Sequence, residues 1–170
     1  MDKAGSQVIL IAGTWGDADV WWRSGSAFSR MLVDSGVTLL SPDDPFRWTT
    51  ALDGLIGRNQ EWERAGDAVR WFANAKLPPR DGQIQRVSIV SYSHSGNVVA
   101  YACASGLLVD RLITVGTPVR REMTAIYEAA RTNITTWIHL YSDAADIWQW
   151  LGSLRPGRLL AWLRGASFTR

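Results

Sequence analysis

Residues 86–100 read RVSIVSYSHSGNVVA, and this stretch decides the fold. Its first half is rich in Val and Ile, which predicts a buried strand, and the small, apolar residues 95–104 predict a helix. The turn between them carries Ser93, with the small residues Ser91 and Ser95 two positions to either side. Such a turn is so tight that bulkier side chains at those positions would strike the neighbouring elements. The pattern predicts a nucleophile turn at Ser93, with an ordinary strand–helix turn carrying an N-cap serine as the alternative.

The rest of the chain alternates apolar runs with helical stretches. Strands are predicted at residues 8–12, 37–40, 86–92, 112–115 and 134–141, and helices at residues 26–35, 58–75, 95–104, 121–131, 145–151 and 159–163. Strands separated by helices predict an α/β fold, a three-layer and mostly parallel sheet with helices on both faces. Functional sites in such sheets lie at the carboxyl ends of the strands.

The composition predicts one globular domain over residues 1–170 that binds neither nucleic acid nor metal. Lys and Arg number 18 against 16 Asp and Glu, and the basic residues are scattered, so no basic patch is expected. The single cysteine, Cys103, excludes an intramolecular disulfide, and the apolar run at residues 8–12 is too short for a signal peptide or membrane span. We therefore predict a cytoplasmic protein. The acidic residues lack the spacing and companions of a metal site, and no cofactor is expected.

The strand and turn around Ser93 resemble a known family. Residues 90–99 (VSYSHSGNVV) look like the Gly-His-Ser-His-Gly-Gly-Asn segment of lipase- and esterase-like α/β-hydrolases, with two glycines replaced by serine and one histidine by tyrosine. Residues 8–15 (VILIAGTW) look like the family's first core strand and oxyanion loop, with alanine where histidine is common. The resemblance makes Ser93 the nucleophile and the N–H of Thr14 one oxyanion donor. The N–H of His94, at the helix start, is placed to be the other donor.

Two later segments extend the resemblance in the order of the family. Residues 112–118 (LITVGTP) look like the strand that follows the nucleophile helix. Residues 138–147 (IHLYSDAADI) look like the strand whose following loop holds the triad acid. The resemblance implies Asp146 as that acid, with Asp143 as the second choice.

The general base is missing from its usual place after the acid. A serine hydroxyl needs a neighbour that takes its proton, and histidine does this best near neutral pH. Both histidines, His94 and His139, precede Asp146. We expect His94 to border the pocket without reaching the Ser93 oxygen, and His139 to be a hydrogen-bonded core residue.

Three explanations fit the missing base. The chain is a C-terminally shortened hydrolase core without its last strand and histidine loop, or a partner chain supplies the base, or the protein is a non-catalytic relative. The first is preferred, because the sequence stops where the last strand should begin. A chain of this kind should be weakly active or inactive alone.

The tryptophans around the predicted oxyanion loop fit a Trp-rich packing loop, which is the preferred interpretation, or an apolar pocket wall. The predicted pocket wall consists of Trp15, Trp21 and Trp22. An apolar C-terminal surface predicts self-association or poor solubility. The expected function is hydrolysis of carboxylic esters, lipid esters among them, through an acyl-enzyme at Ser93. The alternative is a non-catalytic binding or interaction module on the same scaffold.

Overall fold

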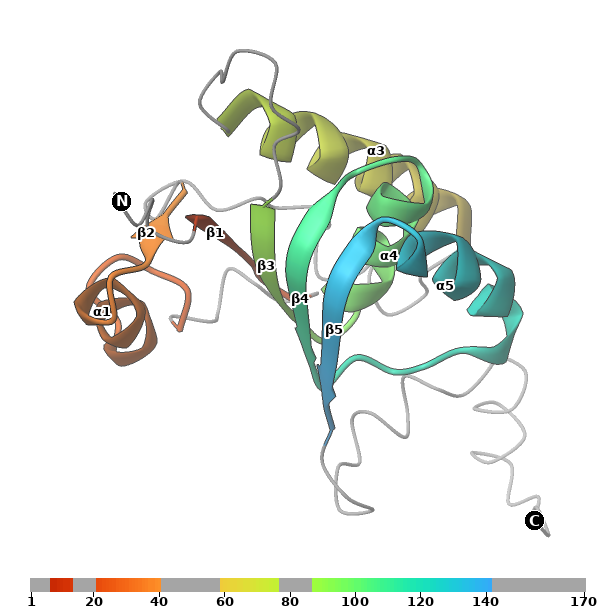
Figure 1. Cartoon of the computed structure of the whole chain (residues 1–170). Coiled ribbons are helices and arrows are strands. Elements are labelled where there is room, and N and C mark those ends of the chain that lie inside the picture. Colours follow the sequence, from red (N-terminus) through yellow and green to blue (C-terminus); the bar gives the residue numbers. More distant parts are fainter. Residues whose placement is uncertain (1–6, 14–20, 41–58, 77–86, 142–170) are drawn as a thin grey trace, which may run out of the picture.

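The computed structural model describes residues 7–13, 21–40, 59–76 and 87–141, which contain a five-stranded parallel sheet (Figure 1). The strands are β1 (Gln7–Ile11), β2 (Thr38–Leu39), β3 (Val87–Tyr92), β4 (Val109–Val115) and β5 (Ile134–Leu140). Their order in the sheet is β2-β1-β3-β4-β5, and all four pairings are parallel. After β1 the chain forms β2 at one edge of the sheet, and it then crosses to the other side of β1, where it adds β3, β4 and β5 in turn. The crevice of such a sheet therefore opens between the carboxyl ends of β1 and β3.

Helices cover both faces of the sheet, as the sequence predicts. They are α1 (Ala27–Asp34), α3 (Asn59–Lys76), α4 (Ser95–Ala104) and α5 (Thr124–Arg131), with a short 3-10 helix η1 (Arg121–Met123) before α5. Figure 1 shows α1 on one side of the sheet and α3, α4 and α5 on the other. The α/β class and the three layers are thus present in the described residues.

Alternate side chains along the strands point to opposite faces of the sheet and belong to two apolar cores. Ile9 and Ile89 point toward the three-helix side, where they pack with Val98 and Val99 of α4. Val8, Leu10 and Val90 belong to the smaller cluster on the α1 side. Strands that are buried on both faces read as continuous apolar runs, which explains VILI in β1 and the Val and Ile of β3.

Helix α4 is the central helix of the larger core. Nine of its residues are buried. Most of its side chains are small, so α3 and α5 can pack closely against it. Gly66 of α3 lies directly against α4, where an added Cβ would lie 2.7 Å from the Cβ of Tyr101 and 2.9 Å from the backbone nitrogen of Ala102. Glycine is needed there because the two helices meet backbone to backbone.

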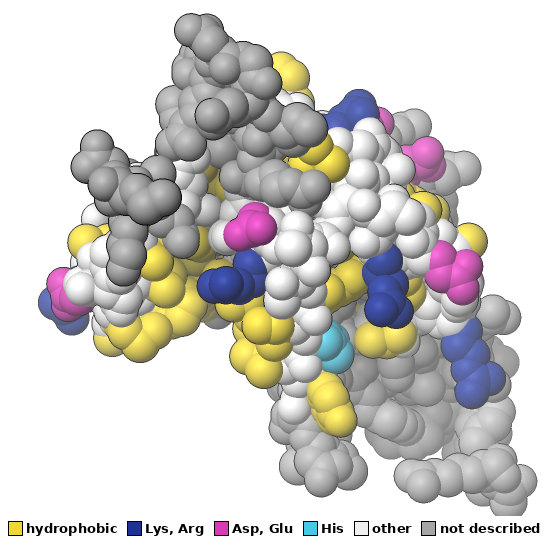
Figure 2. Space-filling model, in the orientation of Figure 1, with side chains coloured by type: hydrophobic (Ala, Val, Ile, Leu, Met, Phe, Trp, Pro, Cys, Tyr) yellow, Lys and Arg dark blue, Asp and Glu magenta, His cyan; other side chains and the backbone are white. Residues whose placement is uncertain are grey.

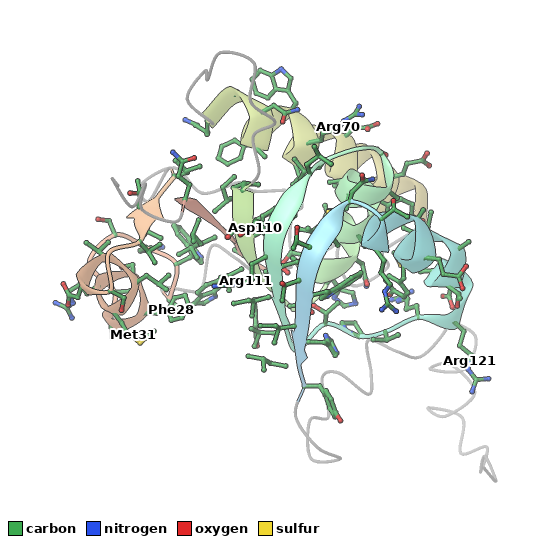
Figure 3. All side chains as sticks on the ribbon, in the orientation of Figure 1. Phe28, Met31, Arg70, Asp110, Arg111 and Arg121 are labelled. Atoms are coloured by element: carbon green, nitrogen blue, oxygen red, sulfur yellow. The ribbon has the colours of Figure 1, made fainter. Side chains whose placement is uncertain are left out.

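The predicted elements match the observed ones closely, with one clear correction at β4. This strand begins at Val109 and not at residue 112, because Val109 and Arg111 already pair with both neighbouring strands. Asp110 and Arg111 are exposed (Figure 3). The helices predicted at residues 145–151 and 159–163 lie outside the described residues. Within the described part of the chain, no helix combines the length and apolarity that crossing a membrane requires.

Candidate nucleophile site

Ser93 occupies a sharp turn between β3 and α4, at the carboxyl end of a central strand. β3 ends at Tyr92 and α4 begins at Ser95, so only two residues reverse the chain. The φ angle of Ser93 is +58°, and no other non-glycine residue in the described part of the chain has a positive φ. Left-handed backbone is costly for a residue with a Cβ and is found where the surroundings enforce it. Ser93 remains partly exposed.

Backbone and side-chain hydrogen bonds hold both peptide groups of Ser93. Its N–H donates to the carbonyl oxygen of Val115, at the end of β4, at 2.8 Å. Its carbonyl oxygen accepts from the hydroxyl of Thr117 at 2.8 Å and from the N–H of Gly96 at 3.2 Å. The strained conformation is therefore fixed from the neighbouring strand and from the following helix.

Ser95 reinforces the turn with its hydroxyl. The side chain is completely buried, and its Oγ accepts from the N–H of Tyr92 at 3.0 Å. The same hydroxyl lies 2.7 Å from the carbonyl oxygen of Tyr92 and 3.2 Å from that of Ile11, and either can accept its proton. Ser95 is thus more than a small residue that fits the turn, because it links the ends of β1 and β3.

The end of β1 lies directly against the turn at Ser93. A Cβ added at Gly13 would lie 3.0 Å from the Cβ of Ser93 and 3.1 Å from a ring carbon of Tyr92. The backbone that leads into Thr14 therefore begins within van der Waals distance of Ser93. The turn thus places a serine with a left-handed backbone between a strand and the N-terminus of a helix. The chain matches no protein-family model, no curated protein and no solved structure.

An aromatic cluster flanks the turn on the α1 side. Tyr92 is 42% exposed, and its ring meets the ring of Trp21 at a centroid distance of 6.3 Å. Trp21 also packs edge-on against Phe28 of α1, at 5.6 Å. Trp22 lies in the core, where only 4% of its surface is exposed. Of the predicted wall residues, Trp21 therefore lies beside the turn, and Trp22 belongs to the core on the α1 side.

The two histidines have different surroundings. His139 on β5 is partly buried, its Nδ1 lies 2.8 Å from the hydroxyl of Thr114, and its ring stacks on Tyr141. Burial lowers the pKa of His139 below its ordinary value. His94 is the N-cap residue of α4, and its Nε2 is buried. His139 is hydrogen-bonded, as expected, although it is only half-buried.

Several predicted site residues lie outside the described part of the chain, namely Thr14, Trp15, Asp143 and Asp146. Within residues 7–13, 21–40, 59–76 and 87–141, no three His, Cys, Asp or Glu side chains come together as a metal site.

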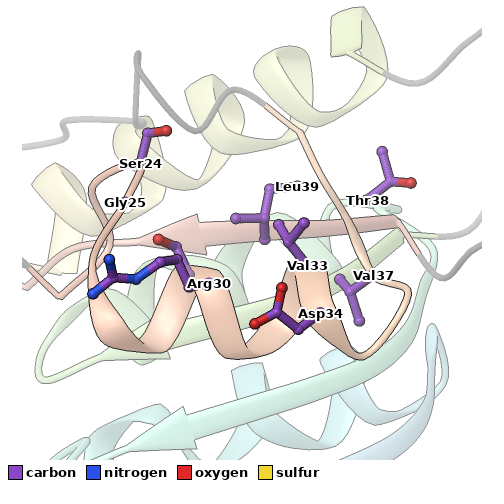
Figure 4. A pocket seen from close by; sticks show the side chains of 9 residues that line it. Ser24, Gly25, Arg30, Val33, Asp34, Val37, Thr38 and Leu39 are labelled. Carbon is purple, nitrogen blue, oxygen red and sulfur yellow. The ribbon is translucent and has the colours of Figure 1, made fainter.

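A groove of about 490 Å³ lies between α1 and β2 (Figure 4), lined by residues such as Arg30, Asp34 and Thr38. The described residues that line this groove lie between Ser24 and Leu39, and none belongs to the turn at Ser93. The groove is therefore separate from the candidate nucleophile site.

The sequence did not reveal the roles of two hydroxyl groups. Those of Ser95 and Thr117 hold the turn, but a serine after the nucleophile and a threonine after a strand are too common to be recognised. The only available signal was that both residues lie within three positions of the end of a predicted strand.

Proposed function

We propose that this protein has an α/β-hydrolase-like architecture and a serine acyl-transfer site, with Ser93 as the nucleophile toward carboxylic esters. The observation that carries the proposal is the φ angle of +58° at a serine between a central parallel strand and a buried helix. A strained serine at this point exposes its hydroxyl at the rim of the sheet. The strand order, with a crevice between β1 and β3, adds support.

The chemistry follows from the positions of the backbone groups around Ser93. The hydroxyl oxygen would attack the ester carbonyl carbon, while a base removes its proton. The oxyanion that forms would be held by the N–H of His94 and that of Thr14, which follows the tightly packed Gly13. Collapse of this intermediate expels the alcohol, which takes the proton, and water then hydrolyses the acyl-enzyme. Asp146 would orient a histidine base that is neither His94 nor His139 and that these 170 residues do not supply.

The aromatic rings beside the turn favour an ester with an apolar group. Tyr92 and Trp21 form a partly exposed apolar surface next to Ser93. Exposed apolar side chains also gather over α1 and near the ends of β4 and β5, on the face seen in Figure 2. Lipid esters are therefore the preferred substrate class within the proposal.

A fluorophosphonate probe tests the proposal, because it reacts with activated serine hydroxyls. We expect slow labelling of the folded protein, located on Ser93 by peptide mass spectrometry and abolished in Ser93→Ala. Ser105→Ala, at the exposed opposite end of α4, is the matched control and should be labelled like the wild type. Labelling that survives in Ser93→Ala, or a folded protein that is never labelled, contradicts the proposal.

The hydrogen bond between His139 and Thr114 favours a second candidate, a non-catalytic binding module. One of the two histidines already has a structural partner, and the other is the N-cap residue of α4. Ester binding by a folded protein that the probe never labels would support this candidate. The predicted cytoplasmic location and self-association stay predictions from the sequence.

A further inference from the structure

Thr117 contacts the peptide group that joins Ser93 to His94, on its carbonyl side. Its hydroxyl donates to the carbonyl oxygen of Ser93 at 2.8 Å. That carbonyl and the N–H of His94 belong to one planar peptide unit. A hydrogen bond that fixes the carbonyl therefore also fixes the direction in which the N–H of His94 points.

We propose that Thr117 is a positioning residue for the oxyanion donor at His94. This inference rests on the proposed function and adds a residue that acts through the backbone of the turn. A donor on a carbonyl oxygen draws electron density from the amide nitrogen, which makes the N–H on the same peptide a stronger donor. Thr117 thus both orients the N–H of His94 and polarises it toward the developing oxyanion.

The hydroxyl of Thr117 is itself held in place. The residue is only 5% exposed, and it packs against the helix start at Gly96. A Cβ at Gly96 would lie 2.7 Å from Cγ2 of Thr117 and 2.9 Å from its Cβ, so only glycine permits this approach. This close packing holds the Thr117 side chain in the orientation in which its hydroxyl donates to the carbonyl oxygen of Ser93.

A second clamp fixes the loop that carries Thr117. The buried side chain of Asn97 donates from Nδ2 to the carbonyl oxygen of Pro118 at 3.3 Å. Its Oδ1 accepts from the hydroxyl of Tyr127 on α5 at 2.8 Å. The phenol in turn accepts from the backbone N–H of Arg120 at 3.2 Å. This network ties the loop to α4 and α5, which is the kind of support that a preorganised donor requires.

Removal of the hydroxyl without loss of shape tests the inference. Thr117→Val keeps the branched side chain but cannot donate, Thr117→Ser keeps the hydroxyl, and Thr117→Ala is a second hydroxyl-free variant if valine perturbs folding. Two quantities are measured on the full chain: the rate constant for fluorophosphonate labelling of Ser93, and the ¹⁵N resonance of the His94 amide. Urea unfolding of each variant checks that the fold is retained.

We expect Thr117→Val to be labelled roughly 10- to 100-fold more slowly than the wild type, because a displaced oxyanion donor loses much of its effect. The ¹⁵N resonance of His94 should move upfield, since less electron density is drawn from the nitrogen. Thr117→Ser should restore both quantities. Equal rates and an unmoved resonance in Thr117→Val, or equal losses in the serine variant, overturn the inference.

Failure of the proposed function has a different signature. A wild type that is never labelled removes the hydrolase proposal, and the inference about oxyanion stabilisation with it. The His94 resonance then still shows whether Thr117 controls this peptide, and an unmoved resonance in Thr117→Val refutes that control as well.

Discussion

Replacement of Ser95 by alanine should destabilise the protein through a single buried hydroxyl. Ser95 Oγ is the acceptor for the N–H of Tyr92 and can donate to the carbonyl of Tyr92 or Ile11, and no part of the residue is exposed. Alanine fits the same space but leaves the N–H without this acceptor. A buried donor without a partner costs about 1–3 kcal/mol. We therefore expect the free energy of unfolding to fall by about 2 kcal/mol, which lowers Tm by about 4–8 °C in a chain of this size.

Urea unfolding followed by tryptophan fluorescence and far-ultraviolet circular dichroism measures this loss. Ser35→Ala is the control, because the Ser35 hydroxyl also donates to a backbone carbonyl, at 2.8 Å from Met31, but on an exposed helix end. That variant should stay within about 0.5 kcal/mol of the wild type. The reasoning fails if Ser95→Ala is as stable as Ser35→Ala with an unchanged denaturant slope.

Four other substitutions and treatments test the fold and the turn. Ser93→Gly should be about 0.5–1 kcal/mol more stable than Ser93→Ala in urea, because only glycine adopts φ +58° without strain; equal stability would argue against the turn. Gly66→Ala should lose about 1–3 kcal/mol, since its Cβ would meet Tyr101 at 2.7 Å, and an unchanged midpoint would contradict this packing. Burial raises the pKa of Cys103 to about 12, so Ellman's reagent should react with it only in guanidinium chloride, and rapid reaction of the folded protein would refute its burial. The lowered pKa of His139 means that the unfolded state binds more protons as the pH drops below about 7, so the free energy of unfolding should decrease as the pH is lowered, and decrease less in His139→Gln; parallel profiles would contradict this.

The strands and helices could be predicted from the sequence because their periodicities differ and their ends carry clear signals. Ser26, for example, caps α1 by accepting from the N–H of Ser29. The start of β4 was misplaced because Asp110 and Arg111 interrupt the apolar run. Their charges are tolerated since both residues are exposed, a property that depends on which elements cover the sheet and not on the strand itself.

The candidate site could be predicted in part. The position of Ser93 followed from a local pattern of small residues between a strand and a helix. The contacts of Ser93 with Thr117 and of Ser95 with Ile11 depend on the register of three strands, which adjacent residues do not encode. Sequence spacing therefore located the turn but not the groups that hold it.

The conformation of Ser93 gains meaning from comparison with the other tight turns. Wherever else the described chain adopts a positive φ, the residue is glycine: Gly25, Gly36, Gly106 and Gly116. The turn at Ser93 instead keeps a side chain, at a strain of about 1–3 kcal/mol, and the ends of β1, β3 and β4 supply the contacts that hold it. A turn that served only to connect a strand to a helix would be more stable with glycine. The proposed role of the hydroxyl as a nucleophile would account for this cost.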